Sequence, residues 1–341
     1  MTHRLLVDAL RFPWAIAEEW AAIIPPILCR LILDEPMSAA DREAVDRGRA
    51  AWRVRHNEGW LNGSYTITLV SPPARAYDDH DDAPPRAPEP LYARVAGQGF
   101  SGAVAVIGMY GVLSQRGGID DTSTPMTSMS RLATSVQLAA NDPAVAGIVL
   151  DVDSPGGSVY GCQELADAIF AAREAKPLAA VANSLMASAA YWTACQAGEL
   201  YCAPGGEVGS IGVYTMHTNV AELMKQRGVA VEMISAGKYK TEGNPYGPLS
   251  DEARAAIQGS VDQYYDSFVR AVARGRGVSM KAVREGMGQG RILQGANALE
   301  QKMIDGVATL GQVIDKIGRR AKRGASARAR MQREVDIESL S

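Results

Sequence analysis

Ser188 lies between an apolar run and a series of small residues, an arrangement that can present a serine nucleophile. The apolar run at 178–181 predicts a buried strand, and Ala189 and Ala190 after the serine favour the start of a helix. At such a turn the helix dipole favours negative charge, and small neighbours leave room for a substrate backbone. A serine at a helix start is more commonly an N-cap, however. The segment alone leaves both roles open.

Two consecutive glycines, Gly156 and Gly157, follow a second predicted buried strand at 146–152. Glycines in a tight turn allow backbone N–H groups to point outward toward a bound group. That group could be a phosphate, but the sequence lacks the Lys-Ser/Thr pair of a phosphate-binding loop. It could instead be an oxyanion, because Ser188 lies in the next strand–helix unit. A plain tight turn is the structural alternative.

A serine nucleophile needs a base, and the sequence offers two kinds. His217 is the one histidine in the predicted α/β region, since the other three precede residue 81. A lysine can also act as a base where burial favours its neutral form. Lys238 and Lys240 follow an apolar stretch at 229–234 and precede a loop with glycines and a proline. Alternate residues of an extended chain share a face, so burying only one of these lysines requires a turn between them. Two surface lysines are the simpler interpretation.

These candidate residues need a scaffold, and strand-like and helix-like segments alternate along most of the chain. The pattern predicts strands at 103–107, 146–152, 178–181, 200–202, 211–215 and 229–234, and helices at 131–140, 159–174, 188–197, 219–227 and 250–274. Such alternation is typical of an α/β domain with parallel strands joined by right-handed crossovers.

Composition divides the chain into four regions. A mainly helical extension covers residues 1–70, and a linker rich in Pro and Asp covers 71–90. The α/β domain covers 91–318, and a charged tail that we expect to be disordered covers 319–341. Within the extension we expect helices at 15–33 and 38–55 and a strand at 65–70. The extension could be a packing appendage or a segment that docks a partner, and the sequence favours neither.

Overall composition bounds the function. The chain has 341 residues, of which 47% are hydrophobic, so it can bury a large core. A net charge of −3 gives no general attraction to nucleic acid, and four scattered cysteines predict neither a disulfide framework nor a zinc site. The most apolar stretch, 13–33, is interrupted by charges and two prolines. We therefore expect a soluble cytoplasmic protein without a membrane span, metal or cofactor.

Several motifs in order give the chain a family resemblance. They are Ser154-Pro155-Gly156-Gly157, Ala187-Ser188-Ala189-Ala190-Tyr191, Val208-Gly209-Ser210-Ile211-Gly212-Val213, Ser235-Ala236-Gly237-Lys238-Tyr239-Lys240 and Gly290-Arg291-Ile292-Leu293-Gln294-Gly295-Ala296. Together they resemble the signal peptide peptidase A (SppA) family of serine peptidases, which includes the head-maturation (prohead) proteases of tailed phages. The resemblance implies a ClpP/crotonase-like fold of repeated ββα units. It also implies a Ser/Lys dyad in place of a Ser-His-Asp triad.

The resemblance assigns roles position by position. Ser188 would be the nucleophile, Lys240 the general base, and Ser210 a residue that orients the lysine. The N–H groups of the oxyanion hole would come from Gly156, Gly157 and Ala189. The resemblance also implies a homo-oligomer in which the active site lies near a subunit interface.

The leading interpretation is a phage or prophage protease that cleaves capsid, portal or scaffold proteins, with its own chain among the expected substrates, in the host cytoplasm or the procapsid. One alternative is a general cytosolic peptidase that degrades signal peptides or other peptides. Others are a peptidase that uses His217 as its base, and an enzyme of crotonase-type acyl-CoA chemistry. The alternative from another class is a non-catalytic capsid assembly or scaffold protein.

Overall fold

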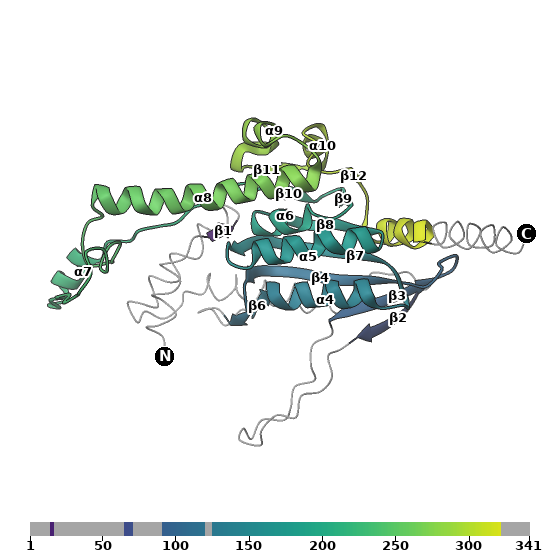
Figure 1. The fold of residues 1–341 in the computed structure, drawn as a ribbon, viewed down its shortest axis with the longest axis horizontal. Helices are drawn as coiled ribbons and strands as arrows, with labels where there is room; N and C mark the ends of the chain where they lie inside the picture. Colours follow the sequence, from purple (N-terminus) through teal and green to yellow (C-terminus); the bar gives the residue numbers. More distant parts are fainter. Residues whose placement is uncertain (1–13, 17–64, 71–90, 120–124, 322–341) are drawn as a thin grey trace, which may run out of the picture.

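The computed structural model describes residues 14–16, 65–70, 91–119 and 125–321. Within them, strands and helices alternate around one main sheet, so the predicted α/β class is confirmed (Figure 1). The remainder of the predicted extension, the linker at 71–90 and the tail beyond residue 321 lie outside the described residues. Their predicted structure stays a prediction, as does the division into regions.

Three parallel strands form the centre of the sheet. They are β4 (Ala103–Ser114), β7 (Val145–Ser158) and β8 (Leu178–Ala187), and β10 (Glu207–Gly209) continues parallel beside β8. Their near-continuous apolar sequences are those of strands buried on both faces. The path along the sheet runs β11-β10-β8-β7-β4-β3-β2. The other strands are β1 (Trp14–Ile16), β2 (Tyr65–Val70), β3 (Tyr92–Gly97), β5 (Gly118–Ile119), β6 (Pro125–Ser128), β9 (Glu199–Cys202), β11 (Ile292–Gln294) and β12 (Gly306–Val307).

Alternate residues of the central strands enter two separate cores. Ile148 and Leu150 of β7 join the core that includes helices α4 (Met129–Asn141), α5 (Cys162–Ala175) and α6 (Ala189–Ala194). Val149, between them, joins the core on the other face, which a helix at 310–321 covers through Leu310 and Ile314. This two-residue period follows from the pleat, which points successive side chains to opposite faces. The central strands are thereby held rigidly between two layers of helix.

A long helix, α8 (Asp251–Arg276), joins the core only near its C-terminal end. Phe268 and Val272 are wholly buried there, and Phe268 stacks on Trp192 of α6. The rise of 1.5 Å per residue puts Glu252 roughly 24 Å along the axis from Phe268. Figure 1 shows α7 (Ala221–Gln226) and the first part of α8 standing away from the sheet. Three short helices follow α8, namely α9 (Met280–Glu285), a 3₁₀ turn (Met287–Gly290) and α10 (Gly295–Glu300).

Several predicted boundaries are wrong. The tight turn expected at Gly156 and Gly157 is strand, because β7 keeps β4 as a partner along this stretch and gains β1. The strands expected at 211–215 and 229–234 are not formed, apart from a bridge at Tyr214, because neither segment has a partner strand in the described residues. Ala15 and Ile16, expected in a helix, pair as strand β1, and residues 319–321, expected in the disordered tail, are helical. Among the described residues, no helix is long and apolar enough to cross a membrane.

Candidate active site

The turn at Ser188 connects β8 directly to α6 and is strained. Ser188 has φ 53° and ψ −120°. Residues other than glycine adopt this backbone conformation at a cost of roughly 1–3 kcal/mol. Its N–H donates to Gly209 O (2.7 Å), and its carbonyl accepts the first helical bond from Trp192 N–H (2.8 Å). Its side chain makes no capping hydrogen bond, so the alternative of an ordinary N-cap is wrong.

The hydroxyl of Ser188 is enclosed and unpaired. Ser188 is wholly buried, and its Oγ has no hydrogen-bond partner in the part of the chain that the structure describes. A buried hydroxyl without a partner costs roughly 1–3 kcal/mol, so evolution retains such groups chiefly where they serve a function. The strain and the unpaired hydroxyl together are typical of a nucleophile held on a strand-to-helix turn.

Ser210 lies beside Ser188 through the pairing of β10 with β8. Gly209 is opposite Ala187 in the parallel register. Ser210 follows Gly209 and Ser188 follows Ala187, so the two serines lie at neighbouring ends of adjacent strands. Ser210 also has φ 53°, and its N–H donates to Arg291 O (2.9 Å). No hydrogen bond joins its side chain to Ser188 Oγ, so the lysine-orienting role of Ser210 stays a prediction.

A glycine is required at position 209, at the end of β10. Replacing it tests whether the hydrogen bond from Ser188 N–H to Gly209 O supports the Ser188 turn. The φ of Gly209 is +132°, and an added Cβ would lie 2.5 Å from Arg291 O. We expect Gly209→Ala to cost about 2 kcal/mol or more and to lower Tm by roughly 4–8 °C. Any reaction that depends on the Ser188 hydroxyl should slow with it, because Gly209 O accepts the hydrogen bond of the Ser188 N–H. Thermal unfolding with Gly205→Ala as control checks this, since an added Cβ at Gly205 meets nothing within 4 Å. Equal Tm values for the two variants would refute it.

Gly156 and Gly157 lie on the strand next to the candidate nucleophile, Ser188. Ser154 of β7 is opposite Met186 of β8, which brings Gly156 and Gly157 to the sheet position beside the Ser188 turn. Gly156 has φ 101°, and Gly157 lies so close to β4 that an added Cβ would be 1.9 Å from Leu113 O. The spatial link expected from the sequence between the glycines and the serine is therefore present.

One of the three predicted oxyanion donors is already engaged. Gly156 N–H donates to Ser154 Oγ (3.1 Å), and the same hydroxyl donates to Gly111 O (2.6 Å). The Gly156 N–H can therefore donate to a substrate only after its hydrogen bond to Ser154 Oγ is broken. The oxyanion role of Gly156, Gly157 and Ala189 stays a prediction.

The candidate bases lie on a projecting segment, residues 216–250, which we call the arm. None of its 35 residues is buried. Lys238 Nζ is 3.0 Å from Glu252 Oε1, and Lys240 is exposed, with its N–H donating to Gly237 O (3.2 Å). His217 Nε2 lies 2.9 Å from Asn244 O. Because Ser188 Oγ has no partner, the single chain joins neither Lys240 nor His217 to the serine.

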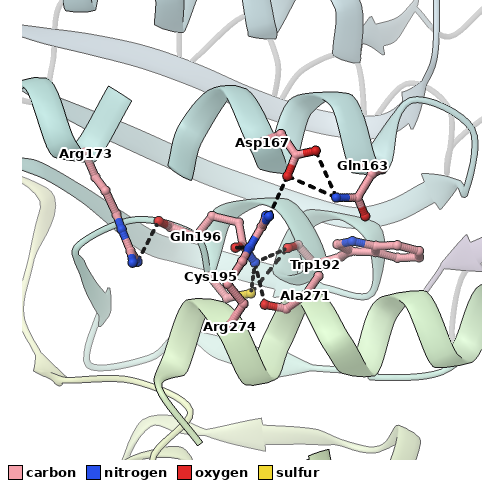
Figure 2. Close-up of polar contacts among 8 residues, drawn as sticks. All are labelled: Gln163, Asp167, Arg173, Trp192, Cys195, Gln196, Ala271 and Arg274. Atoms are coloured by element: carbon pink, nitrogen blue, oxygen red, sulfur yellow. Dashed lines mark hydrogen bonds and ion pairs between the residues drawn. The ribbon is translucent and has the colours of Figure 1, made fainter. Parts of the chain in front are cut away.

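A polar cluster fixes the far end of α6, as Figure 2 shows. Gln196 Nε2 donates to Ala271 O on α8 (2.8 Å), and Gln196 Oε1 accepts from Arg274 Nε (2.9 Å). Arg274 also pairs with Asp167 on α5 (2.6 Å). Burial acts to raise the pKa of Asp167, but hydrogen bonds from Gln163 and Arg274 outweigh it and lower the pKa. The cluster thus ties α6 to α5 and α8.

The sequence interpretation missed this cluster. Its signal was a glutamine next to an alanine-rich helix, since a buried amide of that kind must find partners. The described cysteines, by contrast, offer no alternative nucleophile. Burial raises the pKa of the Cys195 thiol to about 12 and that of Cys202 to about 11, so both thiols stay protonated and inert at neutral pH.

Comparisons with known proteins agree with the motifs. Residues 171–323 match the model of peptidase family S49. The chain is 32% identical over 202 residues to capsid assembly protease C of Escherichia phage lambda, covering 59% of this chain and 46% of that protein. It is 30% identical over 211 residues to the head-tail preconnector protein GP5 of Enterobacteria phage P21, covering 62% and 42%. The chain thus spans about half the length of these curated relatives.

Among solved structures, a ClpP1 mutant from Listeria monocytogenes is similar with a TM-score of 0.39 and 13% identity, over 61% of this chain and 94% of that one. The matched family region contains Ser188, Ser210 and Lys240. The family resemblance predicted from the ordered motifs is therefore confirmed: residues 171–323 match peptidase family S49, and the similar proteins include phage capsid assembly proteases and a putative SppA peptidase.

Proposed function

We propose that this protein is a serine endopeptidase that uses a Ser188/Lys240 dyad. The observation that carries the proposal is the Ser188 turn, in which a buried, unpaired hydroxyl stands on a strained backbone beside the glycines of β7. The match of residues 171–323 to a peptidase family adds a second reason to assign peptide-bond hydrolysis to this turn.

The chemistry follows from the groups involved. Neutral Lys240 Nζ takes the proton of Ser188 Oγ, and the oxygen attacks the carbonyl carbon of the scissile peptide bond. The N–H groups of Gly157 and Ala189, joined by Gly156 once Ser154 releases it, hold the negative oxygen of the tetrahedral intermediate. The C–N bond breaks as the lysine returns its proton to the leaving amine. Water then attacks the acyl-enzyme by the reverse proton path, which frees the acid and restores Ser188.

The base reaches the serine of a neighbouring subunit in this proposal. A lysine is an effective base only where burial disfavours its charged form, and Lys240 is exposed on an unburied arm in the single chain. Docking of the arm against a second copy would bury Lys240 and complete the site. The protein is therefore a homo-oligomer with each active site near a subunit interface.

The composition of the arm supports a partner surface. The arm exposes several large apolar side chains, namely Met216, Val229, Val231, Met233, Ile234 and Tyr239. Ile234 is 94% exposed, and such a cluster on a projecting segment is typical of a protein interface. Val229, Val231 and Met233 alternate as the residues on one face of a strand do. A second copy of the chain would supply the partner strand that this segment lacks among the described residues.

The proposed substrates are capsid, portal or scaffold proteins of a tailed phage, and the chain itself. Support comes from relatives whose names refer to capsid assembly and to the head-tail preconnector. The corresponding location is the host cytoplasm or the procapsid. A general peptidase for signal peptides is the second candidate, because a putative signal peptide peptidase SppA of Enterococcus faecium also matches, at 27% identity.

A fluorophosphonate probe tests the function directly. We expect the oligomer to be labelled covalently, and peptide mapping by mass spectrometry to find the adduct on Ser188. Ser184, which is exposed four residues earlier, should carry none. Co-expression with capsid, portal and scaffold proteins then tests the substrates. A protein that assembles capsids without labelling or cleavage would instead be a non-catalytic assembly protein.

A further inference from the structure

Strand β1 lies against the end of β7 that carries Gly156 and Gly157. Gly156 and Gly157 of β7 pair with Val112 and Leu113 of β4. The same two glycines pair antiparallel with Ile16 and Ala15 of β1. A strand has two edges, so β1 must lie on the edge of β7 that faces away from β4.

That edge is the one that β8 vacates. Along most of β7 the neighbour on this side is β8, and the last pair between them joins Ser154 to Met186. β8 then ends at Ala187, and the chain turns at Ser188 into α6. Beyond Ser154, β1 takes the place of β8 and runs along the predicted oxyanion glycines beside the Ser188 turn.

An extended peptide is the natural ligand of a free strand edge. Its backbone groups pair with those of the edge, and binding of this kind depends little on side-chain identity. A substrate whose scissile carbonyl is to meet both the glycine N–H groups and Ser188 Oγ must lie along this edge. The edge is filled by residues of the chain itself.

Two further features are consistent with a closed site. Ser188 is wholly buried and its Oγ has no partner among the described residues, so the candidate nucleophile is not exposed to a substrate in this structure. Gly156 N–H is engaged by Ser154 Oγ, so one predicted oxyanion donor is not available to a substrate.

We propose that Trp14–Ile16 is a tethered occupant of the substrate-binding edge at Gly156–Ser158, and that an extended substrate segment must displace it before cleavage. This inference rests on the proposed function. A tethered segment acts at an effective concentration of about millimolar, so it competes strongly with a free peptide that has the same few backbone contacts. Removing the pairing should therefore raise the apparent substrate affinity about tenfold or more.

A double variant, Ala15→Pro with Ile16→Pro, tests the proposal in the full chain. Neighbouring residues of an antiparallel strand point their N–H groups alternately toward and away from the partner, and proline has none, so the pair removes the ladder donor whichever residue provides it. The control is Ala15→Thr with Ile16→Val, which retains strand propensity. Two quantities are measured. They are the rate of fluorophosphonate labelling of Ser188 and the affinity for a fluorescent synthetic peptide with the sequence of residues 10–20, determined by fluorescence anisotropy.

We expect the proline variant to be labelled about tenfold faster and to bind the peptide about tenfold more tightly than wild type, with the control unchanged. Unchanged labelling and binding in a proline variant that melts like wild type would overturn the inference. Tighter peptide binding without any labelling of Ser188 would uphold the tethered occupant and reject the proposed function instead, which separates the two.

A second variant tests the same inference if the double proline variant fails to fold. Trp14 and Ser158 are directly opposite, at a separation suited to a cross-strand disulfide, so Trp14→Cys with Ser158→Cys can lock β1 in place. Oxidation should slow labelling of Ser188 about tenfold or more, and reduction of the same sample should restore it. Equal rates in the two redox states, with the disulfide verified by mass spectrometry, would overturn the inference.

Discussion

Ser188→Ala is expected to lower the rate of peptide hydrolysis about 10⁴- to 10⁶-fold and to abolish labelling by a fluorophosphonate. In the proposed mechanism the hydroxyl forms the covalent bond, and no other described side chain stands on this turn with an unpaired, buried oxygen. The fold should remain, because within the described part of the chain the Oγ makes no hydrogen bond whose loss could destabilise it. Turnover of a quenched fluorescent peptide, with circular dichroism as the folding check, measures the effect.

The matched control is Ser184→Ala, which removes the same atom four residues earlier in β8. Ser184 is exposed, so we expect wild-type turnover from this variant. Residual hydrolysis by Ser188→Ala within tenfold of wild type would remove Ser188 as the nucleophile. Loss of activity in Ser184→Ala alone would move the assignment to that residue.

The central part of the fold could be predicted from the sequence, because β7 and β8 are continuous apolar runs with helix-forming segments between them. The extension of β7 to Ser158 could not, because Pro155 and two glycines have the composition of a turn. What keeps this stretch extended is pairing with β4 on one edge and β1 on the other, and pairing between distant segments leaves no local sequence signal.

The site was predictable to a similar extent. The order of the motifs identified Ser188 and its neighbouring glycines, and the structure brings them together through the register of β7 and β8. It does not bring Lys240 to them. The alternation at 229–234 has the pattern of a strand, but the predicted strand is not formed, because a strand needs a partner and the described residues offer none to the arm. The same absence explains why the arm has no buried residue and why its lysine lies exposed.

Lys240→Ala is expected to reduce turnover about 10²- to 10⁴-fold, the usual contribution of a general base, without loss of the oligomer. Lys238→Ala is the matched control. Its ion pair with Glu252 is exposed to solvent and contributes little to stability, so this variant should hydrolyse peptide at the wild-type rate. Full activity in Lys240→Ala would reject the lysine base and make His217 the next candidate.

Mixing inactive variants decides whether the lysine acts across the interface. In an oligomer co-expressed from equal amounts of Ser188→Ala and Lys240→Ala chains, no single chain carries both catalytic groups. If Lys240 serves the neighbouring subunit, about a quarter of the sites combine an intact Ser188 with an intact Lys240, and turnover should recover to about a quarter of wild type. Differently tagged chains, purified in series on both tags, provide the mixed oligomer for the assay. A mixed oligomer with no more turnover than the separate variants would show that each dyad forms within one chain, and the arm would then have to fold back toward its own β8.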